Sequence, residues 1–166
     1  SVGGTLTVGG KAEFDSDVCI SGNSQLVGTL KVTGTTTITG NTGFLGTVRV
    51  SGATSLEGAV VVGGKAELNG DVCVSGNSQL VGTLKVTGAT TITGNSGFLG
   101  TVRVSGATSL EGTAHITGTA TITGNSGFLG TVRVSGNTSL EGQLQLTKSA
   151  AAVVCATAIN GVTSVS

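Results

Sequence analysis

One pattern of apolar and polar positions repeats every six residues along almost the whole chain. Counted in sixes from Thr5 to Lys148, the sequence holds 24 hexads without an insertion or deletion. The fourth residue is always Val, Ile, Leu or Phe, and the second is Ala, Ser, Thr, Val or Leu. The sixth is Gly except at Ser16 and Lys148, and every charged side chain stands at position 1, 3, 5 or 6. The hexad therefore separates two apolar positions from a polar set.

This spacing predicts β-strands. Side chains alternate between the two sides of a strand, so positions 2 and 4 share one side while positions 1, 3 and 5 share the other. An amphipathic helix would need apolar residues at spacings of three and four, which the hexad does not supply. A glycine after each short strand allows the chain to turn sharply and lets neighbouring backbones approach closely. We expect positions 2 and 4 to face inward and the charged positions to face outward.

Three strands joined by glycine corners close a triangular coil, and parallel hydrogen bonds stack coils about 4.8 Å apart. Hexapeptide periods are typical of β-helices, and the absence of Pro suits a chain whose amides must all donate to ladders. The predicted fold is all-β: a triangular β-solenoid of 24 hexapeptide repeats. The expected core is position 4 of each hexad: Val8, Phe14, Ile20, Leu26, Val32, Ile38, Phe44, Val50, Leu56, Val62, Leu68, Val74, Leu80, Val86, Ile92, Phe98, Val104, Leu110, Ile116, Ile122, Phe128, Val134, Leu140 and Leu146. The expected corner glycines include Gly22, Gly28, Gly34, Gly40, Gly46, Gly52 and Gly58.

The hexads fit two arrangements, a coil made by one chain or a coil shared by three intertwined chains. The segment 11–58 recurs at 65–112, an offset of nine hexads, and 89–112 recurs at 119–142, an offset of five hexads. In a one-chain coil each hexad stacks over the hexad three places away, so an offset of five moves the copy to another side of the triangle. In an intertwined trimer any whole number of hexads is a neutral shift. The sequence analysis therefore favours three intertwined chains, with the one-chain β-helix as the alternative.

The pattern divides the chain into three parts. Residues 1–4 look like the entry from a preceding hexad, residues 5–148 form the hexapeptide-repeat shaft, and residues 149–166 lie outside the frame. The last part predicts a strand over 152–159, a turn at Asn160-Gly161, and a short final strand. Because the end of a solenoid exposes unpaired ladder groups, we expect this segment to cap the shaft or dock onto a neighbouring module.

Composition excludes some classes of partner. Eight basic residues balance eight acidic ones, which leaves no overall basic charge for nucleic acid. No apolar run is long enough to cross a bilayer, so we expect no membrane span. Cys19, Cys73 and Cys155 have no metal-type spacing. Cys19 and Cys73 hold the same hexad position nine hexads apart, too far to pair with each other, so they are expected to be free thiols or to bridge to another molecule.

The repeat is similar to that of the left-handed hexapeptide acyltransferases, in an aliphatic residue followed four positions later by a small one. Those enzymes have a catalytic His and loops that interrupt the coils to form a pocket. Here His115 is the single His, and no loop interrupts residues 5–148. Acidic residues such as Asp15, Asp17 and Asp71 do not recur in every coil as calcium-binding repeats require. We therefore expect a protein that is not an enzyme, with no catalytic, cofactor-binding or metal-binding residues.

Threonine-rich hexads leave a surface-binding function open. TTTITG, ATTITG and TATITG could present rows of Thr to ice, as part of a monomeric module that binds ice, glycan or a cell surface. Such a face needs Thr at every coil. In a one-chain coil Ser55 and Cys73 interrupt the row between Thr37 and Thr91, so Thr is better explained as a β-branched residue that suits strands.

The run GTLKVTGTTTITGN at 28–41 resembles the hexad-repeat β-helical shafts of bacteriophage and other viral fibres. The resemblance covers residues 5–148 and is one of architecture. It implies a structural protein on the virion surface or outside the cell, acting as a rigid shaft or a repeating filament subunit. It also implies self-association, as a homotrimer or longer filament, and attachment to neighbouring fibre modules.

Overall fold

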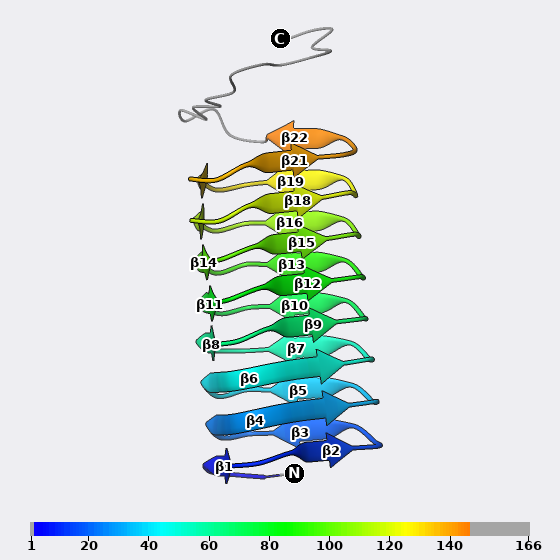
Figure 1. Cartoon of the computed structure of the whole chain (residues 1–166), viewed down its shortest axis with the longest axis vertical. Coiled ribbons are helices and arrows are strands. Elements are labelled where there is room, and N and C mark those ends of the chain that lie inside the picture. The colour runs from blue at the N-terminus through cyan, green and yellow to red at the C-terminus, as the bar shows by residue number, and fades with distance from the viewer. Residues whose placement is uncertain (1, 147–166) are drawn as a thin grey trace, which may run out of the picture.

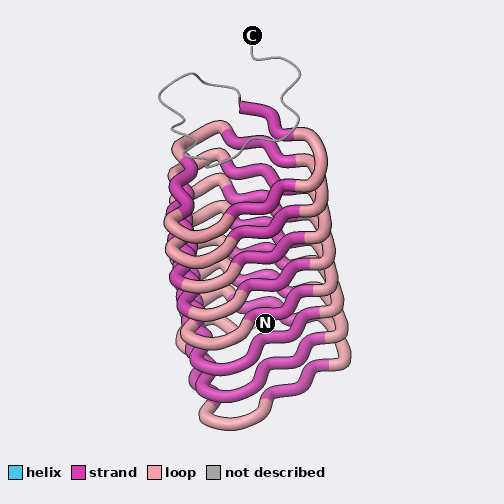
Figure 2. Tube along the Cα trace, turned by 45° about the horizontal axis from the view of Figure 1, so that its top comes forward, coloured by secondary structure: helices cyan, strands magenta, loops and turns pink. Residues whose placement is uncertain are grey.

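The computed structural model describes residues 2–146, which form a rod of stacked coils with 22 β-strands and no helix. Figure 1 shows the coils stacked along the long axis, with the first strand at the bottom and the last at the top. Most strands cover only positions 2 to 4 of a hexad. Positions 5, 6 and 1 form the corners, whose loops stack in columns between the strands (Figure 2). The all-β solenoid predicted from the hexads is confirmed.

The coil has three sides, which we call the first, second and third face. The first face contains β1 (Leu6–Val8), the first part of β4 (Ser24–Val32), the first part of β6 (Thr42–Val50), β8 (Val60–Val62), β11 (Ser78–Val81), β14 (Ser96–Leu99), β17 (Ala114–Ile116) and β20 (Val132–Val134). The second face contains β2 (Ala12–Phe14), the second parts of β4 and β6, β9 (Ala66–Leu68), β12 (Leu84–Val86), β15 (Val102–Val104), β18 (Ala120–Ile122) and β21 (Thr138–Leu140). The third face contains β3 (Val18–Ile20), β5 (Thr36–Ile38), β7 (Thr54–Leu56), β10 (Val72–Val74), β13 (Thr90–Ile92), β16 (Thr108–Leu110), β19 (Ser126–Phe128) and β22 (Leu144–Leu146).

Every strand pairs in parallel with the strand three hexads away in the same chain. Thr54 on β7, for example, lies between Thr36 on β5 and Val72 on β10. Hydrogen bonds at the strand ends follow the same register, as from Thr54 N to Asp71 O at 3.1 Å. The first and second faces merge into one 14-stranded sheet because β4 and β6 continue around the corner, while the third face is a separate 8-stranded sheet.

Of the two arrangements expected from the sequence, the structure has the one-chain coil, not the intertwined three-chain coil that the five-hexad offset favoured. That offset moves a hexad from β13 on the third face to β18 on the second. The move is tolerated because both faces bury positions 2 and 4: Thr90 and Ile92 are buried on β13, and so are Ala120 and Ile122 on β18. The three faces therefore accept the same inward pattern, and a change of face does not require three chains.

The core is the column of side chains along the axis. Every position-4 residue from Ile20 to Phe128 is buried. Val8, Phe14, Val134 and Leu140, in the outermost coils, are partly buried and pack against this column. Position 2 fills the remaining space with smaller side chains, such as Ala66 and Ala114.

The corners are held by glycine and by side-chain amides and carboxylates. At Gly52 a Cβ would lie 2.5 Å from Gly34 O, so stacking of corner on corner excludes a side chain there. Asn and Asp at position 1 accept a hydrogen bond from the backbone N–H one coil later, as from Ala59 N to Asn41 Oδ1 at 3.1 Å. This contact satisfies an amide that turns out of the strand ladder.

Before the first full coil, the chain enters from a preceding hexad. Val2 forms a parallel bridge to Ile20, and Ser21 N donates to Val2 O at 2.9 Å. Residues 2–4 therefore continue the third face. The strand and turn predicted within 149–166, and Cys155, lie outside the described residues.

Candidate functional surfaces

A cavity of about 70 Å³ lies inside the rod, along its axis. Its walls are the inward side chains of consecutive coils, including Phe44, Leu56, Leu80 and Phe98. Sites for small molecules occupy roughly 300–1,000 Å³ and place a few polar groups on the ligand. The side chains that line this cavity include none that titrates. The cavity is a mostly apolar gap in the core.

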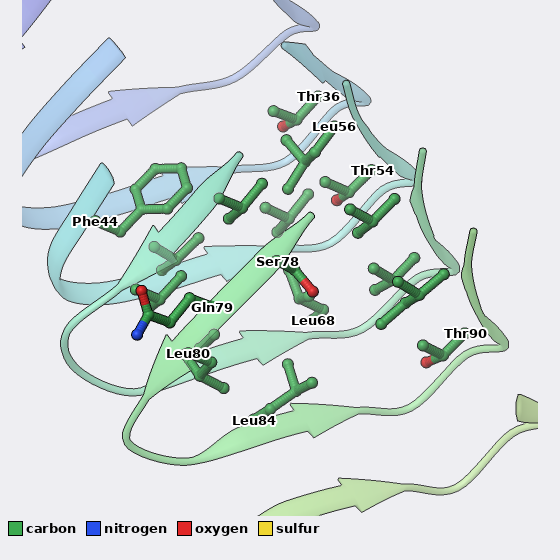
Figure 3. Close-up of a pocket in the computed structure, with 18 of the residues that line it drawn as sticks. Thr36, Phe44, Thr54, Leu56, Leu68, Ser78, Gln79, Leu80, Leu84 and Thr90 are labelled. Atoms are coloured by element: carbon green, nitrogen blue, oxygen red, sulfur yellow. The ribbon is translucent and has the colours of Figure 1, made fainter. Parts of the chain in front are cut away.

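Threonine hydroxyls line one side of this cavity. Figure 3 shows Thr36, Thr54 and Thr90 on strands of the third face, pointing inward. All three are buried, and their hydroxyls have no hydrogen-bond partner among the described residues. An unsatisfied buried hydroxyl costs about 1–3 kcal/mol. In the same row, Val72 lies directly between Thr54 and Thr90. The row therefore accepts an apolar side chain of the same shape.

His115 lies on the outward side of β17, where it pairs in register with Gly97 on β14 and Arg133 on β20. Neither neighbour can accept a proton from it or orient its ring as a carboxylate would. Within residues 2–146, no three His, Cys, Asp or Glu side chains gather closely enough to hold a metal ion. His115 therefore has no partner in its ladder for the chemistry of the acyltransferases.

The threonine rows are interrupted on every face where they occur. Thr37 lies between Cys19 and Ser55, and Thr91 lies between Cys73 and Ser109. Thr121 belongs to the second face and lies between Arg103 and Ser139. An ice-binding surface needs a regular two-dimensional array of identical groups. The one-chain register breaks that array at the residues named from the sequence.

Two clusters of ion pairs lie on the second face, and sequence reasoning missed them. Glu67 contacts Lys65 at 2.9 Å and Lys85 at 3.0 Å. Glu13 is held in the same way by Lys11 and Lys31, each at 2.5 Å. Hydrogen bonds from the paired lysines, and then their charge, lower the pKa of both Glu13 and Glu67 to about 2. Within the first cluster, the hydrogen bond to Glu13 and its charge raise the pKa of Lys31.

The signal that could have revealed these clusters is a spacing of three hexads. Lys31 and Lys85 each stand three hexads after their glutamate, at the same hexad position, so they are neighbours only in a one-chain coil. An intertwined trimer would place these residues three layers apart, so it predicts no such ion pair.

Cys19 and Cys73 are free and exposed, both on outward positions of the third face. Three coils separate them, about 14 Å at the spacing of stacked strands, and a disulfide needs Cα atoms within about 7 Å. They cannot pair within one chain.

Comparisons with known proteins give no assignment. No protein-family model, no curated protein and no solved structure matches the chain. Among the residues that the structure describes, there is also no helix with the length and apolar character needed to cross a membrane. The function has to be argued from the geometry of the rod itself.

Proposed function

We propose that this chain is a non-enzymatic structural protein, a rigid shaft that separates two modules or repeats as the subunit of a filament. The observation that supports this function is the unbroken three-hexad register from β1 to β22, with no inserted loop at any corner. Eight coils at the spacing of stacked strands make a rod about 40 Å long. Continuous ladders and an axial core resist bending, because a bend would have to break both.

The two ends of the rod favour assembly along its axis. At the first coil, β1 and β2 each pair on one side only among the described strands, as do β20 and β21 at the last. A strand edge with unpaired N–H and C=O groups is a template for another strand. We propose that copies stack end to end through these edges, or that a neighbouring module docks on them.

The location follows from the resemblance of the hexads to viral fibre shafts. We propose that the rod acts outside the cell or on a virion, where such spacers hold a binding module away from a surface. In those shafts three chains share each coil. Because one chain completes each coil here, a homotrimer of this chain would be a bundle of three separate rods.

Electron microscopy and small-angle X-ray scattering of the purified chain test the shaft function. We expect straight rods whose length is about 40 Å, from the spacing of stacked strands, or a multiple of it. Leu6 N donates to Asn23 O, so the next amide in β1, that of Thr7, points toward the open end. Thr7→Pro removes that donor and should abolish end-to-end multiples, while Thr7→Val should leave them. Compact or bent particles, or multiples that Thr7→Pro does not change, would contradict the proposal.

A further inference from the structure

The three faces differ in charge, although their hexads look alike in sequence. Of the described residues, the hexads of the third face carry only acidic charges, at Asp17, Glu57, Asp71 and Glu111. The second face carries six of the eight cations: Lys11, Lys31, Arg49, Lys65, Lys85 and Arg103. The first face has no charged side chain in any of its hexads from Thr5 to Gly100, and beyond them only Arg133.

The uncharged face is also the one that exposes apolar side chains. The described chain has seven exposed large hydrophobic residues, and five lie in hexads of the first face: Val27, Leu45, Val61, Val81 and Leu99. Leu45 and Leu99 are 61% and 59% exposed. Strand register places Val27 beside Leu45 and Val81 beside Leu99, with Gly63 in the coil between the two pairs, so these four side chains form a ridge, interrupted at Gly63, along one edge of the face.

Two glycines next to the ridge have no role inside the chain. Gly43 and Gly97 stand at outward strand positions, two residues before Leu45 and Leu99, and a Cβ at either would meet nothing within 4 Å. Glycine in a strand is destabilising relative to Ala. It is also the residue found where another backbone approaches closely. These two positions leave bare backbone beside an exposed apolar ridge.

A second copy of this chain fits the first face better than either other face. Contact between two third faces would bring acidic groups together, and contact between two second faces would bring together their cations, which outnumber the acidic groups of that face. Like charges placed opposite each other cost several kcal/mol. The first face pairs with itself without that cost over most of its length. Eight coils of six residues give it an area of about 800 Å², which is what each partner buries in a standard stable interface.

We propose that the first face is the interface of a dimer in which two rods lie side by side in opposite directions. The orientation follows from symmetry. Leu45 and Gly43 lie in the third coil and Leu99 and Gly97 in the sixth, so they are equally distant from the middle of the eight coils. A two-fold axis at that middle, perpendicular to the rod, places Leu45 against Leu99 of the second copy and Gly43 against its Gly97. The antiparallel order also keeps the two copies of Arg133 apart at opposite ends, where a parallel pair would bring them together.

The chain supplies its own control. The hexad Asn-Thr/Ser-Gly-Phe-Leu-Gly occurs three times, twice on the first face and once on the third, where Leu129 is 53% exposed. Sedimentation analysis of the Thr7→Pro chain, which should not stack end to end, should give a dimer of the 16.0 kDa chain. The double variant Leu45→Glu/Leu99→Glu should raise the dimer Kd by at least about 100-fold, because two glutamates would then face each other at each contact. Leu129→Glu should leave the Kd unchanged.

Circular dichroism separates loss of the dimer from loss of the fold, since all three leucines are exposed and the variants should keep the strand spectrum. If the glutamate variants unfold, Leu45→Ser/Leu99→Ser takes their place and should also weaken the dimer.

Orientation is tested with the other cysteines changed to Ser: Leu45→Cys chains mixed with Leu99→Cys chains should form a disulfide, and Leu45→Cys chains alone should not. A chain that stays monomeric at about 1 mM would overturn the proposal. So would equal weakening by Leu129→Glu, or a dimer that dissociates in high salt, which would point to contact between second and third faces.

Discussion

Glycine occurs in two different settings in this chain, at the corners and at outward strand positions. At a corner such as Gly52, a side chain would collide with the carbonyl of Gly34 one coil below. At an outward strand position such as Gly127, a Cβ would meet nothing within 4 Å. Ser16 occupies a corner position without conflict because it lies in the first coil, with no residue of the chain three hexads before it. The corner glycines could be predicted from the hexad, whereas the outward ones could not.

Gly52→Ala and Gly127→Ala should therefore change stability in opposite directions. The free energy of unfolding, measured by denaturant titration, should fall by about 1–3 kcal/mol for Gly52→Ala, because the new methyl group forces two stacked backbones apart. It should rise by about 0.5–1 kcal/mol for Gly127→Ala, because alanine restricts the unfolded chain and meets no atom in the folded one. A stabilising Gly52→Ala would show that the corners are not in contact.

Single substitutions of the buried threonines on the third face should stabilise the fold. Thr54→Val and Thr90→Val remove hydroxyls that have no partner among the described residues and copy the side chain of Val72 between them. Each should raise the free energy of unfolding by about 1 kcal/mol, since the cost of a buried unsatisfied hydroxyl is removed at constant shape. The matched outward change Thr37→Val should stay within about 0.5 kcal/mol of the original chain. Destabilisation by Thr54→Val would mean that its hydroxyl is hydrogen-bonded after all.

At the scale of the strand, the hexad predicts which side chains point inward but not which strands are neighbours. Position 4 is inward whether one chain or three complete the coil, so the expected core residues from Ile20 to Phe128 are buried in this structure. Outward contacts depend on the count of hexads per coil. The contact of Glu67 with Lys85 exists because β9 and β12, three hexads apart in the chain, stack as neighbours. In an intertwined trimer consecutive hexads would stack, so the same two residues would lie three layers apart.

Acidification should test the Glu67 cluster directly. Because the pKa of Glu67 is about 2 in the folded chain against its usual 4.5, its carboxylate stabilises the fold fully above pH 4.5, and this contribution is lost as the pH falls through about 2. Thermal unfolding should show the original chain to be more stable than Glu67→Gln at pH 6, with the difference shrinking between pH 4.5 and 2. Glu111→Gln, outside the ion pairs of the described residues, is the control. A difference between the original chain and Glu67→Gln that persists at pH 2 would contradict the assignment.

For the whole molecule, the architecture could be predicted from the hexad pattern and the number of chains per coil could not. A strict hexad with inward aliphatic residues and corner glycines specifies a triangular solenoid. It carries no signal for chain number, because every hexad satisfies every side of the triangle. The separation of charge onto different faces became visible only when hexads were grouped in threes, as in the column Glu13, Lys31, Arg49, Glu67 and Lys85 of the second face.

Equivalence of the faces can be tested by lengthening the chain. Insertion of three hexads after Gly76, copied from 59–76, should add one coil, about 4.8 Å, to the rod measured by X-ray scattering. Insertion of one hexad copied from 71–76 should add a third of that and should unfold at nearly the same temperature, because each later hexad still finds an apolar interior on its new face. If the shorter insertion alone lowers the melting temperature by more than about 2–4 °C, equivalent to about 1 kcal/mol in a domain of 150–250 residues, the faces are not interchangeable.

The shift of a hexad from β13 to β18 has a consequence for how such a protein diversifies. Insertions of three hexads, which add a whole coil, lengthen the rod and leave every later hexad on the same face. Insertions of one or two hexads rotate everything that follows, so that a leucine exposed on one face comes to be exposed on another. A single insertion can thus move exposed apolar surface from one face of the rod to another without replacing a single amino acid.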